Sequence, residues 1–343
     1  IISSFAVILF VWTDIKILFL ALIIIKSVQL MYMGWIVYSL PSEKRFGFDV
    51  GFLNDQFKYS FPLAAAAFTL LAGKEIDKAI VSHFLSVEEF AVYGRGATEL
   101  PLSTIITASV TSMLAMAFVQ KLNEKNYKEF MKIWHDAIRL VAILLFPLFV
   151  FFISISKEFI TLLYSDTYTG SVPIFVCYLC LLPTQVTAFD GIIRYAGKTK
   201  IILVISGLTI CINVVLSIVL IKQIGALGPA IAVFCANGVV LPLSYIIYIS
   251  KFTSTPFNKV LPWKELAIIM TISIFSGSLV ILLKFLFNSK ILIIIFECIL
   301  FGLTYPFIIW RTHLLRIEEK IYFKNRIIKP LALLFPKKFF QND

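Results

Sequence analysis

Long apolar runs, separated by short polar stretches, follow one another along almost the whole chain. They occupy residues 1–12, 16–40, 57–84, 90–118, 133–155, 172–193, 201–222, 228–249, 266–287 and 291–310. Apart from the first, these runs match the roughly 20 residues that a helix needs to cross a hydrocarbon core of about 30 Å. They are continuous and do not alternate with period two, as the strands of a porin-like barrel would. The pattern predicts an all-α, polytopic membrane protein.

The first apolar run, IISSFAVILFVW (1–12), is too short for a complete span. It has neither the charged start nor the small-residue cleavage site of a signal peptide. We interpret it as the end of a helix and expect the chain to be the C-terminal portion of a longer protein. The loop SEKRFGFDV (42–50) combines charge, glycine and a break in hydrophobicity, which makes it the expected boundary between two helix bundles.

Composition supports a membrane location. Apolar residues make up 59% of the chain and charged residues 15%, and the mean hydropathy is +0.93. Soluble domains have about 45–50% apolar and about 25% charged residues. A chain of this composition has too little polar surface to cover itself in water.

Lysine and arginine are distributed unevenly between the loops. One set of alternate loops, together with the C-terminal tail, carries 21 of them, whereas the opposite set carries four. The positive-inside rule then predicts that the C-terminus and the long basic loops are cytoplasmic. The tail LRIEEKIYFKNRIIKPLALLFPKKFF (315–340) is expected to lie along the anionic inner leaflet. The net charge of +11 is therefore explained by topology and not by nucleic-acid binding.

Charged residues within the predicted spans are the first sign of function. They are Lys26, Lys74, Glu75, Asp77, Lys78, Arg95, Glu99, Asp136, Arg139 and Asp190. Each costs roughly 2.5–3.5 kcal/mol at mid-membrane unless it faces a partner or water. Spacings of three or four residues place four pairs on the same helix faces: Lys74 with Asp77, Glu75 with Lys78, Arg95 with Glu99, and Asp190 with Arg194. Such pairs would neutralise each other and lock helices together. The whole set favours a polar cavity.

These charges are expected in two layers. The sequence LSVEE (85–89) is typical of a turn between two antiparallel helices. Asp77, Arg95 and Glu99 then lie level with one another, about 12–18 Å below that turn at a rise of about 1.5 Å per residue. A second group is expected near the cytoplasmic ends of the helices, and it consists of Asp136, Arg139, Asp190 and Arg194.

Proline and the absence of catalytic motifs indicate a transporter. Six prolines lie within spans, where they free backbone carbonyls and permit the bends that alternating access requires: Pro62, Pro101, Pro147, Pro183, Pro242 and Pro306. The three histidines are widely separated and lack metal-ligand spacing. No nucleophile elbow, P-loop or dinucleotide-binding glycine motif occurs. We expect no enzymatic activity, no metal and no cofactor.

Three stretches, in a fixed order, resemble a known family. They are IDKAIVSHFLSVEEFAVYGRGATELPL (76–102), KEFITLLYSDTYTGSVPIF (157–175) and GKTKIILVISGLTICINVVLSIVLIKQIGALGPAIA (197–232). The first places an aspartate before a short turn that ends in Tyr93. The third combines its G-K-T-K start with Asn213 and with the turn of Gly225 and Gly228. Over about 57–250 the chain resembles the polysaccharide-biosynthesis (O-antigen) flippases, Wzx-like members of the multidrug/oligosaccharidyl-lipid/polysaccharide superfamily.

The resemblance implies a transporter fold of two six-helix bundles, often with two further helices. Its expected organisation in this chain is the last two helices of an incomplete N-terminal bundle (1–40), a cytoplasmic linker (41–56), a six-helix C-terminal bundle (57–250), a cytoplasmic loop (251–265), two extra transmembrane helices (266–310) and a basic cytoplasmic tail (311–343). A bacterial inner membrane is the location that the family implies.

The resemblance also implies a substrate, an undecaprenyl-diphosphate-linked oligosaccharide moved from the inner to the outer leaflet during surface polysaccharide biosynthesis. Cations would bind the diphosphate and sugar, and acids would hold the cations in position or bind a coupling ion. The expected substrate-binding residues are Lys26, Lys74, Asp77, Lys78, Arg95, Glu99, Arg139, Asp190 and Arg194. Expected partners are the lipid-linked oligosaccharide, membrane lipid and other polysaccharide-assembly membrane proteins, but no nucleic acid.

Two other functions remain open from the residues. A multidrug or cation antiporter of the same superfamily would be expected to have a more acidic cavity than five basic and five acidic in-span residues provide. A membrane-embedded glycosyltransferase or polymerase would be expected to have a clustered catalytic motif and a sizeable loop domain, and the sequence has neither.

Overall fold

The structure is a computed structural model that describes residues 15–39, 50–186, 191, 193–194, 196–284, 290–316 and 319–320. Within these residues the secondary structure is helical and no strand is formed. The chain divides into two compact units, residues 1–57 and residues 58–343. Each unit is considered by itself.

The described part of the first unit is α2 (Ile15–Ser39) and the beginning of α3 (Val50–Phe84). Large apolar side chains of α2, including Leu30, Met31 and Trp35, are exposed, as suits a helix in contact with lipid. Helix α3 begins at Val50, inside the segment 41–56 that we expected to be a linker. Residues 41–49 of that segment lie outside the described residues.

The second unit contains the rest of α3 and a series of further helices. They are α4 (Val87–Gly96), α5 (Pro101–Asn123), α6 (Tyr127–Ser154), α7 (Ser156–Tyr164), α8 (Ser171–Leu179), α10 (Thr199–Ile224), α11 (Leu227–Val233), α12 (Leu241–Thr253), α13 (Trp263–Lys284) and α14 (Lys290–Arg311). Short 3₁₀ turns cover Asp166–Tyr168 (η1), Leu182–Gln185 (η2) and Phe257–Lys259 (η4), and a π-helical stretch, η3 (Phe234–Val240), joins α11 to α12.

Five helical stretches in the described residues are long and apolar enough to cross a membrane. They are Val87–Asn123, Tyr127–Ser154, Thr199–Ile224, Leu227–Thr253 and Lys290–Arg311. The prediction of an all-α, multi-pass membrane protein is confirmed.

Proline determines where several of the predicted spans are interrupted. The run 90–118 was expected to form one helix, but it is broken between α4, which ends at Gly96, and α5, which begins at Pro101. Leu100 has extended backbone angles, as the residue before a proline prefers. Similarly, α8 ends at Leu179 and Pro183 lies in the first turn of η2. By contrast, Pro62, Pro147 and Pro306 lie inside α3, α6 and α14.

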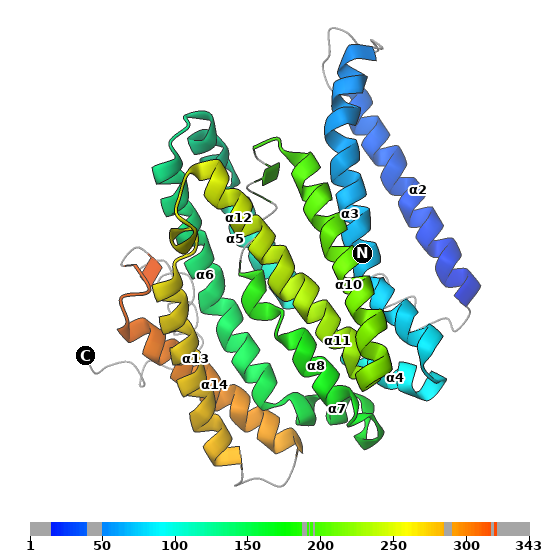
Figure 1. Cartoon of the computed structure of the whole chain (residues 1–343), viewed down its shortest axis with the longest axis vertical. Coiled ribbons are helices and arrows are strands. Elements are labelled where there is room, and N and C mark those ends of the chain that lie inside the picture. The colour runs from blue at the N-terminus through cyan, green and yellow to red at the C-terminus, as the bar shows by residue number, and fades with distance from the viewer. Residues whose placement is uncertain are drawn as a thin grey trace. The chain divides into compact units, whose positions relative to one another are not determined.

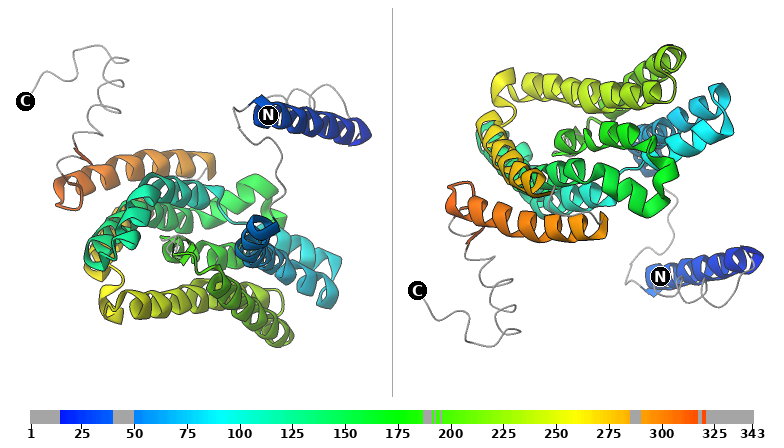
Figure 2. Two further views of the ribbon diagram at one scale, coloured as in Figure 1. Left: turned by 90° about the horizontal axis from the view of Figure 1, so that it is seen from above. Right: turned by 90° about the horizontal axis from the view of Figure 1, so that it is seen from below.

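Helix α6 forms the centre of the larger core of this unit. It packs against α5 and α13, and α13 packs in turn against α14 (Figure 1). Phe130, Trp134, Ile138 and Leu145 are among its fully or almost fully buried side chains. In both views of Figure 2, α14 and the α11–α12 segment lie on opposite sides of this unit. A smaller core joins α3, α4, α8, α10 and α11 through residues such as Val81 and Tyr178.

Candidate functional site

A buried carboxylate joins three helices of the smaller core. Asp77 of α3 has no exposed surface, and its Oδ2 accepts hydrogen bonds from the hydroxyls of Tyr93 on α4, at 2.5 Å, and Tyr178 on α8. The two hydroxyl oxygens are 3.3 Å apart. The other carboxylate oxygen, Oδ1, is buried and has no hydrogen-bond partner in the described part of the chain. Asp77 was expected beside cations, but its hydrogen bonds come from hydroxyl groups.

A fourth helix adds polar groups one turn away from Asp77. The side-chain amide of Asn213 on α10 donates a hydrogen bond to the carbonyl of Gly73 at 3.4 Å. Ser217, one turn further along α10, donates to Oδ1 of Asn213 at 3.2 Å. Both side chains are buried. The polar groups therefore continue from the Asp77 cluster into the α3–α10 contact.

Arg95 lies at the end of α4 and is exposed. Its guanidinium carbon is 4.9 Å from the ring centroid of Tyr164 and 5.8 Å from that of Tyr168. It forms no ion pair with a carboxylate in the described part of the chain. The expected helical pairing of Arg95 with Glu99 does not exist, because α4 ends at Gly96 and Glu99 lies in the non-helical segment before Pro101.

A different arrangement surrounds Arg139 of α6, whose side chain is almost completely buried. Its two terminal nitrogens donate to both carboxylate oxygens of Glu319, at 3.0 and 2.6 Å. It also donates to the carbonyl of Leu314. Arg316 donates to Asp136, one turn before Arg139 on α6. We call this set of contacts of α6 with Leu314, Arg316 and Glu319 the tail clip.

The remaining expected site residues do not join one cluster in the described structure. Lys26 is exposed in the first unit and donates to Gln29 at 3.3 Å. Lys78 pairs with Glu75 at 3.1 Å, which confirms the spacing argument for that pair. Arg194 is exposed. The side chain of Lys74 and the whole of Asp190 lie outside the described residues.

One buried charge was missed in the sequence. Glu297 of α14 has no exposed surface, and its Oε2 accepts a hydrogen bond from Ser154 at 3.4 Å. It lies within the apolar run 291–310, so the rule that selected the other in-span charges applies to it as well. Its position among Ile293, Phe301 and other buried residues at helical spacing places it in the α14 packing face.

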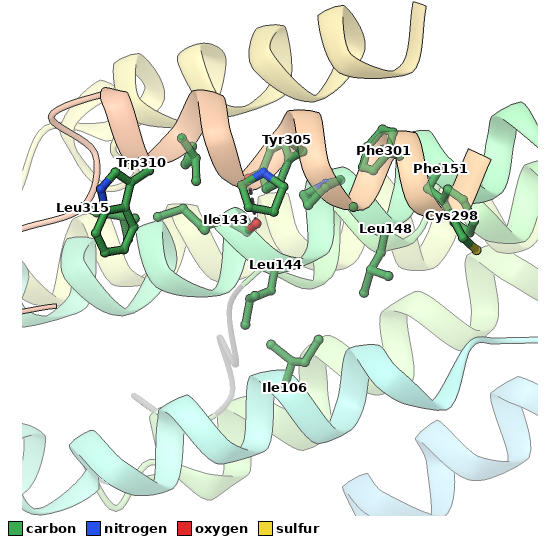
Figure 3. A pocket seen from close by; sticks show the side chains of 14 residues that line it. Ile106, Ile143, Leu144, Leu148, Phe151, Cys298, Phe301, Tyr305, Trp310 and Leu315 are labelled. Atoms are coloured by element: carbon green, nitrogen blue, oxygen red, sulfur yellow. Dashed lines mark hydrogen bonds between the residues drawn. The ribbon is translucent and has the colours of Figure 1, made fainter. Parts of the chain in front are cut away.

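An apolar cavity of about 580 Å³ lies between α5, α6 and α14 (Figure 3). Ile106, Leu144, Leu148 and Phe301 are among its lining residues. Tyr305 and Ile143 also line it, and the hydroxyl of Tyr305 donates to the carbonyl of Ile143 at 2.7 Å, so it is satisfied within the protein. The lining suits an apolar chain and offers no charged group for a polar head.

The arrangement of helices is similar to that of a solved transporter, the lipid II flippase MurJ in an inward closed conformation. The TM-score is 0.56 and the sequence identity is 18%. The match covers 82% of this chain and 59% of the MurJ chain, so the chain spans less than two thirds of that flippase. A comparison with curated proteins gave no match. The chain therefore shares the all-α, polytopic fold of that structure.

The family follows from a second comparison. A family model described as "Polysaccharide biosynthesis protein" matches residues 1–173, about half of the chain. The matched region contains Asp77, Arg95 and Arg139. The chain belongs to this polysaccharide biosynthesis family, in agreement with the resemblance found in its sequence.

Proposed function

We propose that the protein is a flippase that moves an undecaprenyl-diphosphate-linked oligosaccharide from the inner to the outer leaflet of the bacterial inner membrane during surface polysaccharide biosynthesis. In this proposal it is a transporter and not an enzyme, its C-terminus is cytoplasmic, and it works by alternating access. The family and the flippase-type fold support the proposal at a coarse level. The identity of the oligosaccharide is to be determined by the transport experiment described below.

The single observation that carries the proposal is the buried Asp77 cluster. A carboxylate inside an apolar helix bundle costs several kcal/mol unless it has partners, and packing alone does not need one there. Asp77 receives hydroxyl donors from α4 and α8, so its charge state acts directly on the contacts between three helices. We propose that binding of a proton or another coupling cation at Asp77 changes those contacts during transport.

Cations supply the affinity for the substrate head in this proposal. Arg95 is exposed and has no carboxylate partner in the described part of the chain, which leaves it available to a phosphate group. Lys26, Lys74, Lys78 and Arg194 remain proposed contributors. Arg139 is a weaker candidate, because the tail clip already occupies its guanidinium.

The test is transport of a defined lipid-linked oligosaccharide by the complete protein in proteoliposomes, with Asp77→Asn as the critical variant. The asparagine oxygen still accepts a hydrogen bond, so the fold should survive. Loss of the charge should lower transport by roughly tenfold to hundredfold, since hydrogen bonds to charged groups contribute about 1.5–3 kcal/mol.

The matched control is Glu75→Gln, which removes an exposed acid from the same helix. It should transport like the wild type. Transport by Asp77→Asn at the wild-type rate would remove the proposed coupling role. Absence of transport by the wild-type protein with every lipid-linked oligosaccharide tried would contradict the function itself.

A further inference from the structure

The turn between α7 and α8 presents two tyrosines to Arg95. Tyr164 is the last residue of α7 and Tyr168 the last residue of η1, and both rings are half-buried. Their ring centroids are 6.2 Å apart in an edge-to-face arrangement. Because Arg95 contacts both rings, its guanidinium is held by aromatic faces and not by an opposite charge.

Close packing of α4 on α8 fixes the place of Arg95. The Ser171 hydroxyl donates to the carbonyl of Val92 at 2.6 Å. A Cβ atom at Gly96 would lie 2.6 Å from the carbonyl oxygen of Ser171 and 2.7 Å from Cβ of Ile174, so only glycine permits this approach. Arg95 is the neighbour of that glycine, and its backbone is therefore anchored beside the turn.

The turn itself holds a strained residue. Ser165, between the two tyrosines, has φ 86° and ψ 167°, a region that is occupied almost only by glycine. Next to it, Asp166 accepts from Lys290, the first residue of α14, at 2.5 Å. This ion pair neutralises the one carboxylate of the turn and ties the turn to α14.

We propose that Arg95, Tyr164 and Tyr168 form a binding site for a phosphate or diphosphate group, on the side of the membrane opposite the basic loops. The identity of the natural ligand, the diphosphate head of the lipid-linked oligosaccharide, rests on the proposed function. Under the predicted topology this is the outer side, where the substrate leaves.

The chemistry follows from how arginine behaves on aromatic rings. A guanidinium that stacks on ring faces keeps N–H donors for an anion, and its planar fork matches phosphate oxygens. The tyrosines also restrict the side chain before the ligand arrives, so less rotamer freedom is lost on binding. Tyr164 and Tyr168 are thus positioning residues, and Arg95 is the residue that contacts the anion.

The test measures binding to the complete purified protein with two probes, inorganic pyrophosphate and undecaprenyl diphosphate. Arg95→Gln should weaken both by about tenfold or more. Tyr164→Leu and Tyr168→Leu should each weaken both by roughly three- to tenfold, whereas the Phe variants should stay within about twofold of wild type, because the ring and not the hydroxyl holds the cation.

Two control variants separate this role from a structural one. Lys222→Gln removes another cation that lies over an aromatic ring, that of Phe84, and should bind both probes like the wild type. Tyr248→Leu removes a tyrosine stacked on Phe252 and should do the same. Thermal unfolding of each variant checks that the protein is intact.

The outcomes distinguish this site from the proposed function. Equal affinity of wild type, Arg95→Gln and the Leu variants for both probes would overturn the site, even if the protein transports. The expected variant pattern with pyrophosphate alone would support the anion site but contradict a lipid-linked ligand. The expected pattern with both probes supports the site and its assignment to the lipid-linked head.

Discussion

Two groups of charged side chains, the tail clip on the one hand and Asp77 and Arg95 on the other, differ in the partners that surround them. In the tail clip, Arg139 meets both oxygens of Glu319, and Asp136 meets Arg316. In the other group, Asp77 has hydroxyl partners and Arg95 has aromatic ones. The clip is a closed set of opposite charges, whereas neither Asp77 nor Arg95 forms an ion pair within the described residues.

This difference shows that a charge within an apolar run has two possible meanings. Both groups look the same in the sequence, and both satisfy the argument that such charges avoid lipid. The partners decide whether the charge holds the fold together or stays available for a ligand. For Arg139 the partner comes from residues 314–319, far along the chain, and no spacing rule could have identified it.

The largest expected effect comes from removing the centre of the clip. Arg139→Gln leaves the Glu319 carboxylate without its fork partner and the Leu314 carbonyl without its donor. Breaking a buried pair costs about 3–5 kcal/mol, and we expect about 3 kcal/mol because Glu319 keeps one-fifth of its side-chain exposure. Equilibrium unfolding in mixed micelles measures this loss of stability.

The matched variant for that comparison is Arg95→Gln. An exposed cation on aromatic rings contributes about 0.5–1 kcal/mol, so its loss should destabilise the fold much less than the loss of Arg139. Equal destabilisation by the two variants would mean that Arg95 is a structural residue, and the contrast between the two groups would be wrong.

Much of the fold was predictable because it depends on local pattern. The apolar runs identified the long helices, since about 20 consecutive apolar residues have few alternatives in a membrane. The break at 97–100 was missed, although Gly96 and Pro101 stood in the sequence as signals for it. Of the candidate site, only the approach of α4 to Asp77 followed from the hairpin, as the hydrogen bond from Tyr93 to Asp77 shows. The tyrosines did not, because Tyr164, Tyr168 and Tyr178 reach the site through tertiary packing.

A smaller effect tests whether the close packing of α4 on α8 holds Arg95 in place. Gly96→Ala would place a methyl group against the carbonyl of Ser171 and against Ile174, and overpacking of this kind costs about 1–3 kcal/mol. Gly94→Ala, two residues earlier on the same helix, meets nothing within 4 Å. That control should be neutral or stabilising by up to about 1 kcal/mol, as expected for alanine in a helix.

The unfolding midpoints of these two variants show whether the close approach of α4 to α8 fixes the position of Arg95. If Gly96→Ala is as stable as Gly94→Ala, the close approach of α4 to α8 does not fix Arg95. If Gly96→Ala is destabilised and also binds pyrophosphate more weakly, helix packing and ligand affinity are connected through this position.

The smallest expected effect is a pH dependence of folding stability that arises from Glu319 in the tail clip. Burial raises the pKa of the Glu319 carboxyl, but hydrogen bonds from Arg139 and from the backbone amide of Arg316 outweigh it, so the pKa lies below its ordinary value. A carboxyl whose pKa is lower in the folded state stabilises the fold above its unfolded pKa, about 4.3. That contribution is lost as the pH falls through the lower, folded value.

Wild type and Glu319→Gln should therefore differ in stability by a constant amount from pH 7 down to about pH 5, on the order of 1 kcal/mol because Glu319 is partly exposed. Below about pH 4.3 the difference should shrink, because the wild-type carboxyl becomes neutral like the glutamine. Binding of a fully ionised anion to Arg95 involves no group of the tail clip, so it should not follow the same curve. Unfolding midpoints of both proteins at several pH values measure the difference, and a gap that widens in acid would contradict the assigned ion pair.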